Sequence, residues 1–227
     1  MKKILIFQWF DCKDQTRRRE LLECIHHNIN LGFDEVIIFN DSIEPVVNAP
    51  HVRNISTNSR ISYLDFINVV KDPQNVGALV VLTNSDIKLD SKILQLAGLK
   101  NRILIALSRY ESNRQLTECA FYSQDVWVMT SQPIHKSIIL QCNIPLGIPG
   151  CDQRFAEIVF SAGFSVFNPC LEIKNTHLHK NVATHLDENR LFGSYLFVIP
   201  CTYEDIRLAR PNIVPRIVRP DRKTYFP

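Results

Sequence analysis

The sequence predicts an α/β fold in which a central, mostly parallel mixed sheet is flanked by helices. Short apolar runs alternate with segments of helical spacing, and several of these runs end directly in small polar residues. The chain of 227 residues is long enough for one large domain with a substantial core. We therefore expect a single domain over residues 1–194, followed by a C-terminal segment over residues 195–227.

The first half of the chain shows the clearest alternation of strands and helices. Apolar runs predict strands at residues 4–7, 36–39, 79–82 and 103–107. Helical spacing of apolar residues predicts helices at residues 16–30, 62–70 and 91–96. Strands separated by helices in this way are typical of a parallel sheet with both faces covered.

The second half of the chain is less regular. Apolar runs predict strands at residues 126–129 and 165–167, and helical spacing predicts a helix at 153–162 that Gly163 ends. Five prolines follow Tyr195, and proline interrupts both helices and central strands. We therefore expect an extended, Pro- and Arg-rich C-terminal arm that packs on the domain or trails from it.

Composition and charge exclude several classes of protein. A net charge of +3 is too small for an extended nucleic-acid interface, so we expect no nucleic-acid partner. The triplet Arg17–Arg19 is interpreted as the solvated face of the first helix. Seven cysteines without CxxC spacing favour free thiols in a reducing compartment. No apolar run approaches the roughly 20 residues that span a bilayer, so we expect a cytoplasmic protein with at most peripheral membrane contact.

Polar groups at three strand ends form the first candidate site, at residues 8–11, 40–41 and 84–86. The carboxyl ends of parallel strands meet at the edge where α/β folds bind ligands. Asp86 is the first candidate metal ligand, because Mg²⁺ and Mn²⁺ accept carboxylate oxygens and let substrate phosphates complete their shell. The alternative is that residues 84–86 form a turn whose aspartate caps the next helix.

A second candidate lies downstream, at His177 and His179. If the chain from Ile173 continues as a strand, both imidazoles point to the same face. An imidazole there suits Mn²⁺ better than Mg²⁺, whereas the alternative is a pair of ordinary hydrogen-bonded histidines. An HExxH pattern is missing from the sequence, so a zinc hydrolase site is not predicted.

The third candidate is Asp152, which follows a glycine-containing loop at residues 147–150 and opens a predicted helix. A helix N-terminus favours the ionised carboxylate, which suits a proton-accepting base. The structural alternative is a helix cap. The neighbouring Cys151 is a weak candidate nucleophile, because the sequence shows no clear histidine partner for it.

Six segments carry a family resemblance when they are taken in chain order. They are residues 60–66 (RISYLDF), 83–87 (TNSDI), 106–110 (ALSRY), 123–127 (SQDVW), 149–154 (PGCDQR) and 168–179 (NPCLEIKNTHLH). Together they resemble small GT-A-type glycosyltransferases of bacteria and large DNA viruses, including the rhamnosyltransferase-like domain of chlorella viruses. The resemblance runs from about Ile4 to Asn181 and implies a single GT-A-like, Rossmann-like domain.

The resemblance also implies a metal site and a base. Residues 84–86 stand where the family has its DXD-type motif, although Asn84 replaces the first acidic residue of that motif. Asp86 would bind the metal of a nucleotide-diphosphate sugar, with His177 or His179 as the C-terminal ligand. Asp152 would be the catalytic base, with Asp125 as the second candidate.

Further residues are implied to form the donor and acceptor pockets. Asp125 and Trp127 would build the acceptor and sugar pocket, and the region of Arg60 would hold the nucleotide or diphosphate. Ser85 and Asn84 would lie beside the bound donor. Their neighbours at the edge of the base and ribose would be Gln8, Asn40 and Asp41.

The implied activity is metal-dependent transfer of a sugar from a nucleotide-diphosphate sugar, with a UDP-sugar favoured, to a glycan or other hydroxyl acceptor. Mn²⁺ or Mg²⁺ would offset the charge of the departing diphosphate as a Lewis acid. A carboxylate on the opposite face would deprotonate the acceptor for in-line attack with inversion. One alternative is a catalytically degenerate sugar-nucleotide-binding module. The other is a nucleotidyltransferase, which would normally need a glycine-rich phosphate loop that residues 8–14 lack.

Overall fold

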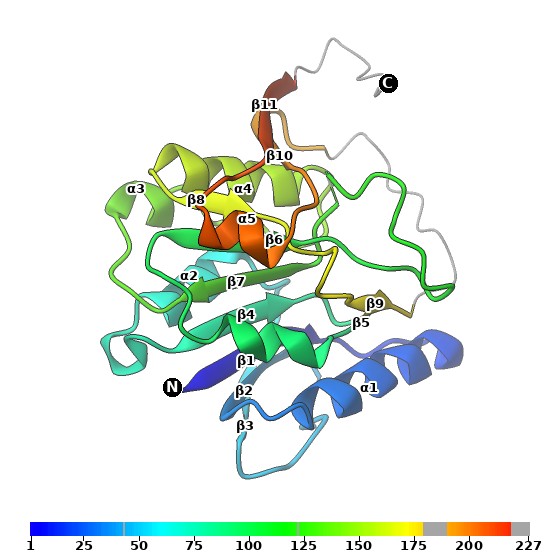
Figure 1. The fold of residues 1–227 in the computed structure, drawn as a ribbon. Helices are drawn as coiled ribbons and strands as arrows, with labels where there is room; N and C mark the ends of the chain where they lie inside the picture. Colours follow the sequence, from blue (N-terminus) through cyan, green and yellow to red (C-terminus); the bar gives the residue numbers. More distant parts are fainter. Residues whose placement is uncertain (43, 122, 179–189, 219–227) are drawn as a thin grey trace.

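A seven-stranded sheet forms the centre of the protein (Figure 1). The computed structural model describes residues 1–42, 44–121, 123–178 and 190–218. The spatial order of the strands is β3-β2-β1-β4-β7-β6-β8. Their bounds are β1 Lys3–Trp9, β2 Glu35–Asn40, β3 Val52–Ser56, β4 Leu79–Thr83, β6 Ile103–Leu107, β7 Val126–Thr130 and β8 Ser165–Phe167. All neighbouring pairs are parallel except those that β7 makes with β4 and β6, which confirms the predicted mixed sheet.

Helices cover both faces of this sheet, so the domain has three layers (Figure 1). The helices are α1 Gln15–Ile29, α2 Tyr63–Val70, α3 Lys136–Ile139 and α4 Cys151–Ser161, with the 3₁₀ helices η1 Pro73–Asn75 and η2 Ser91–Leu96. Apolar side chains of α1 and η2 share one core with the sheet. Those of α2, α3 and α4 share the other core. The predicted α/β class with both sheet faces covered is therefore confirmed.

The run of apolar residues in β1 supplies both cores. Ile4 and Ile6 lie in the core under α2 and α4, whereas Leu5 and Phe7 lie in the core under α1. Because successive side chains of a strand point to opposite faces, a strand covered on both sides needs an uninterrupted apolar sequence. All four side chains are buried. Burying each such side chain contributes about 1.5–3 kcal/mol to folding.

The order of the first four strands determines where a ligand can bind. Strands β1 and β4 are parallel neighbours, with Ile6 opposite Leu82. The chain leaves β1 for β2 on one side and returns through β3 to β4 on the other side. In open α/β sheets, ligands bind outside the carboxyl ends of the strands at such a reversal of strand order. A ligand-binding site is therefore expected at the residues that directly follow β1 and β4.

Two helices begin next to that edge. Helix α1 begins after Asp14, whose side chain accepts a hydrogen bond from the backbone N–H of Arg17 at 2.9 Å. Helix α4 begins after Gly150, which has a φ of 87°. A Cβ atom at Gly150 would overlap the Tyr195 hydroxyl, so glycine is needed there for both backbone angle and space. Helix α4 starts two residues earlier than predicted, which puts Asp152 in its first turn.

The C-terminal segment is more compact than a trailing arm. Strand β10 (Gly193–Val198) pairs antiparallel with β11 (Ile213–Val218), and α5 (Tyr203–Arg207) lies between them in sequence. Leu196 and Val198 are buried in the core with α4. The expected change at residue 195 is therefore not a boundary of the core, since β10 crosses it. Of the predicted arm, only residues 195–218 are described: β10 packs on the domain, whereas β11 pairs with β10 and projects from the domain (Figure 1).

Several shorter elements were not predicted from the sequence. Strand β3 lacks a continuous apolar run, and its side chains are partly or fully exposed because it lies at the edge of the sheet. The pair β5 (Ile87–Lys88) and β9 (Thr176–His177) has two residues per strand. Such short pairs leave no periodic signal. Among the described residues, none of the helices has the length and apolar character needed to cross a bilayer.

Candidate functional site

Asp86 is the centre of a polar cluster at the carboxyl ends of β1 and β4. Its Oδ2 atom accepts a hydrogen bond from Arg17 Nη2 at 2.6 Å. The same oxygen lies 3.1 Å from His177 Nε2. Arg17 lies at the start of α1, the helix that follows β1, and Asp86 lies three residues after the end of β4. The ion pair therefore joins the segments that follow the two strands at the reversal of strand order.

Backbone pairing explains how His177 reaches Asp86 across 91 residues of sequence. Strand β5 pairs antiparallel with β9, and Ile87 lies opposite His177. The His177 N–H donates to the Tyr110 carbonyl at 2.8 Å, and the Leu178 N–H donates to the Asp86 carbonyl at 3.1 Å. The predicted convergence of Asp86 and His177 is therefore present. His179 lies outside the described residues.

A chain of polar contacts continues from His177 and returns to the segment that carries Asp86. His177 Nδ1 lies 3.3 Å from Glu111 Oε2, and Glu111 Oε1 accepts a hydrogen bond from Arg109 Nε at 3.0 Å. Arg109 Nη1 lies 3.2 Å from Asp125 Oδ2. Asn84 Nδ2 donates to Asp125 Oδ1 at 2.9 Å. Loops after β4 and β6 and the start of β7 are thus tied into one network.

The charges in this cluster stabilise each other. Burial alone would raise the pKa of Asp86, but hydrogen bonds and charge from His177 and Arg17 outweigh burial and hold that pKa well below its usual range. Burial would lower the pKa of His177, but its contact with Asp86 raises that pKa above the usual value. The cluster therefore favours an ionised carboxylate between two basic side chains.

Asp125 is buried, and it is held by the network around it. Burial raises the pKa of Asp125, and the charge of Arg109 offsets part of that shift. Arg109 and Asn84 contact both of its oxygens, so this carboxylate would have to release one of these donors before it could take a proton from an acceptor. The geometry favours a positioning role over the predicted second catalytic role.

Asp152 forms a neighbouring cluster on α4. Its Oδ1 atom lies 2.9 Å from Cys151 Sγ and 3.4 Å from the Tyr63 hydroxyl, and its Oδ2 lies 3.4 Å from the Gln124 N–H. Burial raises the pKa of Asp152 to about 7, although these donors and the nearby charge of Asp125 also act on it. A carboxylate with a pKa near neutrality can accept a proton at physiological pH. Since Gln124 precedes Asp125, one short segment joins this cluster to the Asp86 network.

Gln8 and Arg60 make hydrogen bonds that hold the loop after β3, at residues 57–62, in place. Gln8 Nε2 donates to the Ser59 carbonyl at 3.0 Å, and Gln8 Oε1 accepts from the Ile61 N–H at 2.9 Å. The exposed Arg60 donates through Nη1 to the Leu146 carbonyl at 3.1 Å. Gln8 therefore acts through the backbone of this loop, whereas the exposed Arg60 guanidinium keeps further donors for a ligand.

Asn40, Asp41 and Ser85 also lie at the carboxyl edge of the sheet. Asn40 is buried, and both polar ends of its side chain bond to the chain between Ser42 and Glu44. Asp41 is exposed and accepts a hydrogen bond from the Asp11 N–H at 3.2 Å. The Ser85 hydroxyl donates to the carbonyl of Gln8. Asn40 and Ser85 thus hold the edge together, and Asp41 is the more accessible of the three.

Trp127 is placed in the core instead of a sugar pocket. Its side chain is 1% exposed, and its ring lies 5.0 Å from the Tyr63 ring in an edge arrangement. Trp127 is the second residue of β7 and lies opposite Leu82, so it stands within the buried strand and not beyond its end. The ring can influence Asp152 through Tyr63, but it has no open surface for a sugar.

The donor set described here does not fit a divalent cation. Asp86 and His177 converge, but Arg17 already neutralises the Asp86 oxygen. Glu111 contacts His177 Nδ1, whereas Asp86 is approached by Nε2, so the two carboxylates lie at different nitrogens of the same ring. Within the described parts of the chain, no group of three or more His, Cys, Asp or Glu side chains could hold a metal ion. The metal site stays a prediction, because the described residues supply only two of its three ligands.

Asn84→Asp tests whether the triplet lacks only an acidic residue. We expect this change to destabilise the protein by about 1–3 kcal/mol, because it removes the donor to Asp125 and places two carboxylates side by side. Urea denaturation measures the loss, and the exposed Asn68→Asp on α2 is the matched control with little expected change. Unchanged stability together with a higher affinity for Mn²⁺ would contradict this interpretation.

Three network residues were not identified from the sequence. Arg17 was interpreted as part of a solvated helix face, which is wrong for Arg17, since its side chain is 20% exposed and bound to Asp86. The interpretation suits the exposed Arg19. Arg109 and Glu111 follow β6, and polar residues after a parallel strand are the signal that could have identified them.

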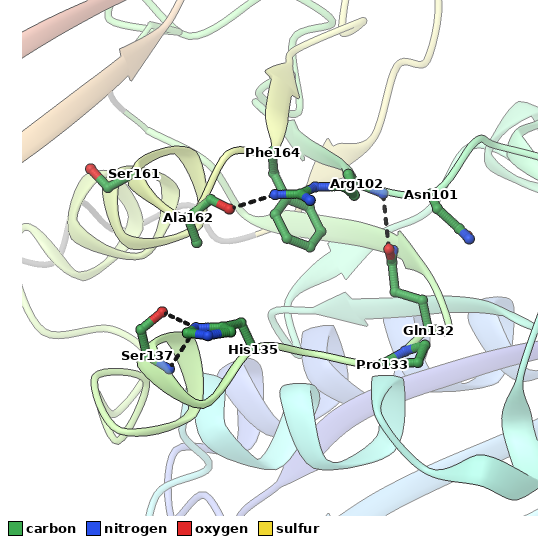
Figure 2. A pocket seen from close by; sticks show the side chains of 9 residues that line it. All are labelled: Asn101, Arg102, Gln132, Pro133, His135, Ser137, Ser161, Ala162 and Phe164. Carbon is green, nitrogen blue, oxygen red and sulfur yellow. Dashed lines mark hydrogen bonds between the residues drawn. The ribbon is translucent and has the colours of Figure 1, made fainter.

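A separate hollow of about 590 Å³ lies at the opposite edge of the sheet (Figure 2). The segments before β6 and β8 and after β7 line it. Arg102 Nη2 donates to the Ala162 carbonyl at 2.9 Å, and the Arg102 N–H donates to Gln132 Oε1 at 2.9 Å, as Figure 2 shows. The guanidinium also lies 5.7 Å from the centre of the Phe164 ring. These contacts explain the arrangement of Arg102 structurally, and the hollow is remote from Asp86 and Asp152.

Comparisons with known proteins leave the family open. No protein-family model matches the chain. No curated protein matches it either. The resemblance to GT-A-type glycosyltransferases therefore stays a prediction. The function proposed below rests on the strand order and on the polar clusters around Asp86 and Asp152.

Proposed function

We propose that this protein is a glycosyltransferase that moves a sugar from a nucleotide-diphosphate sugar to a hydroxyl group of a glycan or another acceptor. One observation carries the proposal. A polar cluster that holds Arg17 and His177 on Asp86, at the strand reversal where α/β folds bind nucleotides, is joined through residues 124–125 to Asp152, a carboxylate whose pKa is raised to about 7. Sugar transfer requires these two features together, a site for a diphosphate and a base.

Arg17 and His177 would supply positive charge to a leaving diphosphate. When the bond between the sugar and the diphosphate breaks, negative charge grows on the diphosphate oxygens. Arg17 and His177 are basic groups fixed by contacts at the end of β4, so they would offset this charge without rearrangement of solvent. The guanidinium of Arg17 is suited to phosphate because its planar donors match two oxygens at once.

Asp152 supplies the base on the acceptor side. The bond to the leaving group weakens before the new bond is complete, so positive charge builds on the anomeric carbon, as in glycoside hydrolysis. Asp152 would take the proton of the attacking hydroxyl, and attack opposite the leaving group would invert the anomeric centre. Its pKa of about 7 leaves a substantial ionised fraction at neutral pH.

A sugar-nucleotide-binding module without catalysis is the second candidate. It is favoured by the contacts of Asp152, since Cys151 and Tyr63 approach one of its oxygens and the Gln124 N–H approaches the other. A base that is held in this way must release a donor before it reaches an acceptor. Turnover of a donor would therefore separate the two candidates.

The first experiment is a panel of nucleotide sugars incubated with the wild-type protein and with Asp86→Asn. We expect slow hydrolysis of one donor, measured as release of the nucleoside diphosphate, and a loss of at least tenfold in the variant because Arg17 and His177 lose their anionic partner. Glu23→Gln is the control, since Glu23 pairs with Lys88 on the surface. Binding of a donor without any turnover would favour the binding module, and no binding of any donor would contradict both candidates.

A further inference from the structure

We infer that Arg17 is the resident cation of this site: its guanidinium neutralises Asp86 when the site is empty and binds the diphosphate of the donor directly, so that diphosphate binding needs no divalent metal. This inference rests on the proposed function, because it concerns the diphosphate of the same donor. It departs from the expected Mn²⁺ or Mg²⁺ dependence.

Arg17 lies where a diphosphate would approach. It belongs to the first turn of α1, the helix that directly follows β1, and β1 is one of the two strands at the reversal of strand order. In nucleotide-binding α/β folds, the diphosphate lies at the start of the helix that follows this strand. The side chain of Arg17 is 20% exposed, so it is partly accessible to solvent.

The contacts of Arg17 place positive charge on one oxygen of the carboxylate that a metal would need. Arg17 Nη2 lies 2.6 Å from Asp86 Oδ2, and His177 Nε2 approaches the same oxygen at 3.1 Å. Arg17 Nη1 also lies 3.4 Å from Glu20 Oε2 on the same helix. A metal ion on Oδ2 would have to displace Arg17, and a metal ion on the other oxygen of Asp86 would lie beside the positive charge of Arg17, which is electrostatically unfavourable.

The remaining acidic and amide groups of the network are committed elsewhere. The Asn84 amide donates to Asp125, which fixes the residue that replaces the first acidic position of the triplet. Glu111 pairs with Arg109 and faces the opposite nitrogen of the His177 ring. Mg²⁺ and Mn²⁺ sites use one or two carboxylates, water and substrate phosphates. Asp86 is the carboxylate that the triplet contributes to this described cluster, and Arg17 already offsets its charge.

Arg17 can contact a diphosphate without losing its place. Its backbone N–H is fixed by Asp14 at 2.9 Å, so the helix start stays in position while the side chain rotates. A guanidinium has five N–H donors, of which Asp86 and Glu20 use only part. Arg17 can therefore bridge Asp86 and a phosphate, or turn from Asp86 to the phosphate while His177 remains on Asp86.

The test compares Arg17→Gln with Arg19→Gln, which removes the same charge two residues away from an exposed position. Binding of inorganic pyrophosphate and of UDP is measured by isothermal titration calorimetry, in EDTA and again with Mn²⁺. Pyrophosphate is included because it carries the diphosphate without a base. We expect both ligands to bind the wild type in EDTA, Arg17→Gln to weaken binding about 10- to 100-fold, and Arg19→Gln to change it less than twofold.

Arg17→Lys keeps the charge at this position and guards against misfolding of the glutamine variant. We expect it to retain part of the affinity, because an ammonium group lacks the planar pair of donors. Binding of pyrophosphate and UDP only with Mn²⁺, together with tighter Mn²⁺ binding by Arg17→Gln in electron paramagnetic resonance titrations, would overturn the inference and leave the proposed function standing. No binding of any nucleotide sugar in the panel would overturn the proposed function itself.

Discussion

Asp152→Asn is expected to lower the rate of sugar transfer by about 10²- to 10⁴-fold, the usual contribution of a positioned general base. The change keeps the size and shape of the side chain but removes its ability to accept a proton. It is measured as product formation with the donor that the panel identifies. Glu157→Gln on the same helix is the matched control, because Glu157 pairs with Arg154 and Ser161 away from Asp152.

The pH profile of the wild type provides an independent check on Asp152. Since its pKa is raised to about 7, the rate should rise as the pH increases through 7 and level off above it. A flat profile over this range, or near-normal transfer by Asp152→Asn, would show that another group takes the proton. Asp125 would then be the next residue to test.

The same pKa has a consequence for stability. Asp152 binds its proton more tightly in the folded protein than in the unfolded chain, whose aspartates have a pKa near 3.9. Between about pH 4 and pH 7 the folded state therefore holds more protons than the unfolded state. The contribution of Asp152 to the free energy of unfolding falls as the pH rises through this range. The free energy of unfolding is measured by urea denaturation at pH 5 and at pH 8. Asp152→Asn should remove the part of its decrease between these two pH values that Asp152 causes. Its folded state should be at least as stable as the wild type at pH 8.

Phe155→Ala is expected to destabilise the protein by about 3–5 kcal/mol, the usual cost of removing a fully buried aromatic side chain. Phe155 is 0% exposed, and its ring stacks on Tyr63 with a centroid distance of 4.1 Å and an interplanar angle of 8°. It also meets the edge of Phe66 at 6.2 Å. The loss is measured as the free energy of unfolding in urea.

Phe160→Ala is the control for this change. Phe160 lies on the same helix but is only partly buried, so its removal should cost clearly less. Because Tyr63 also approaches Asp152, Phe155→Ala should in addition shift the pH profile of transfer in the protein that remains folded. Equal losses for the two variants would show that the core around Tyr63 is less tightly packed than the ring geometry indicates.

The sequence by itself predicted the elements whose signal is local. The runs at residues 4–7, 79–82 and 103–107 became β1, β4 and β6, because strands covered on both faces need continuous apolar sequence. It also placed Asp86 beyond a strand and Asp152 at a helix start, since both positions follow directly from the ends of these elements. The short edge elements carry no such pattern, and the segment from residue 195 was predicted as an extended arm from its five prolines, although the buried strand β10 ends before the first of them.

Only the tertiary structure decided how the site is assembled. The contact between Arg17 and Asp86 spans 69 residues, and that between His177 and Asp86 spans 91. Contacts at this separation depend on strand order and on the pairing of β5 with β9, and neither is encoded in local periodicity. The same holds for Trp127, which is a core residue because β7 lies between β4 and β6 in the middle of the sheet. A side chain's partners depend on which chain segments pack together, so the sequence determined the positions of these charges along the chain and the fold determined which of them meet.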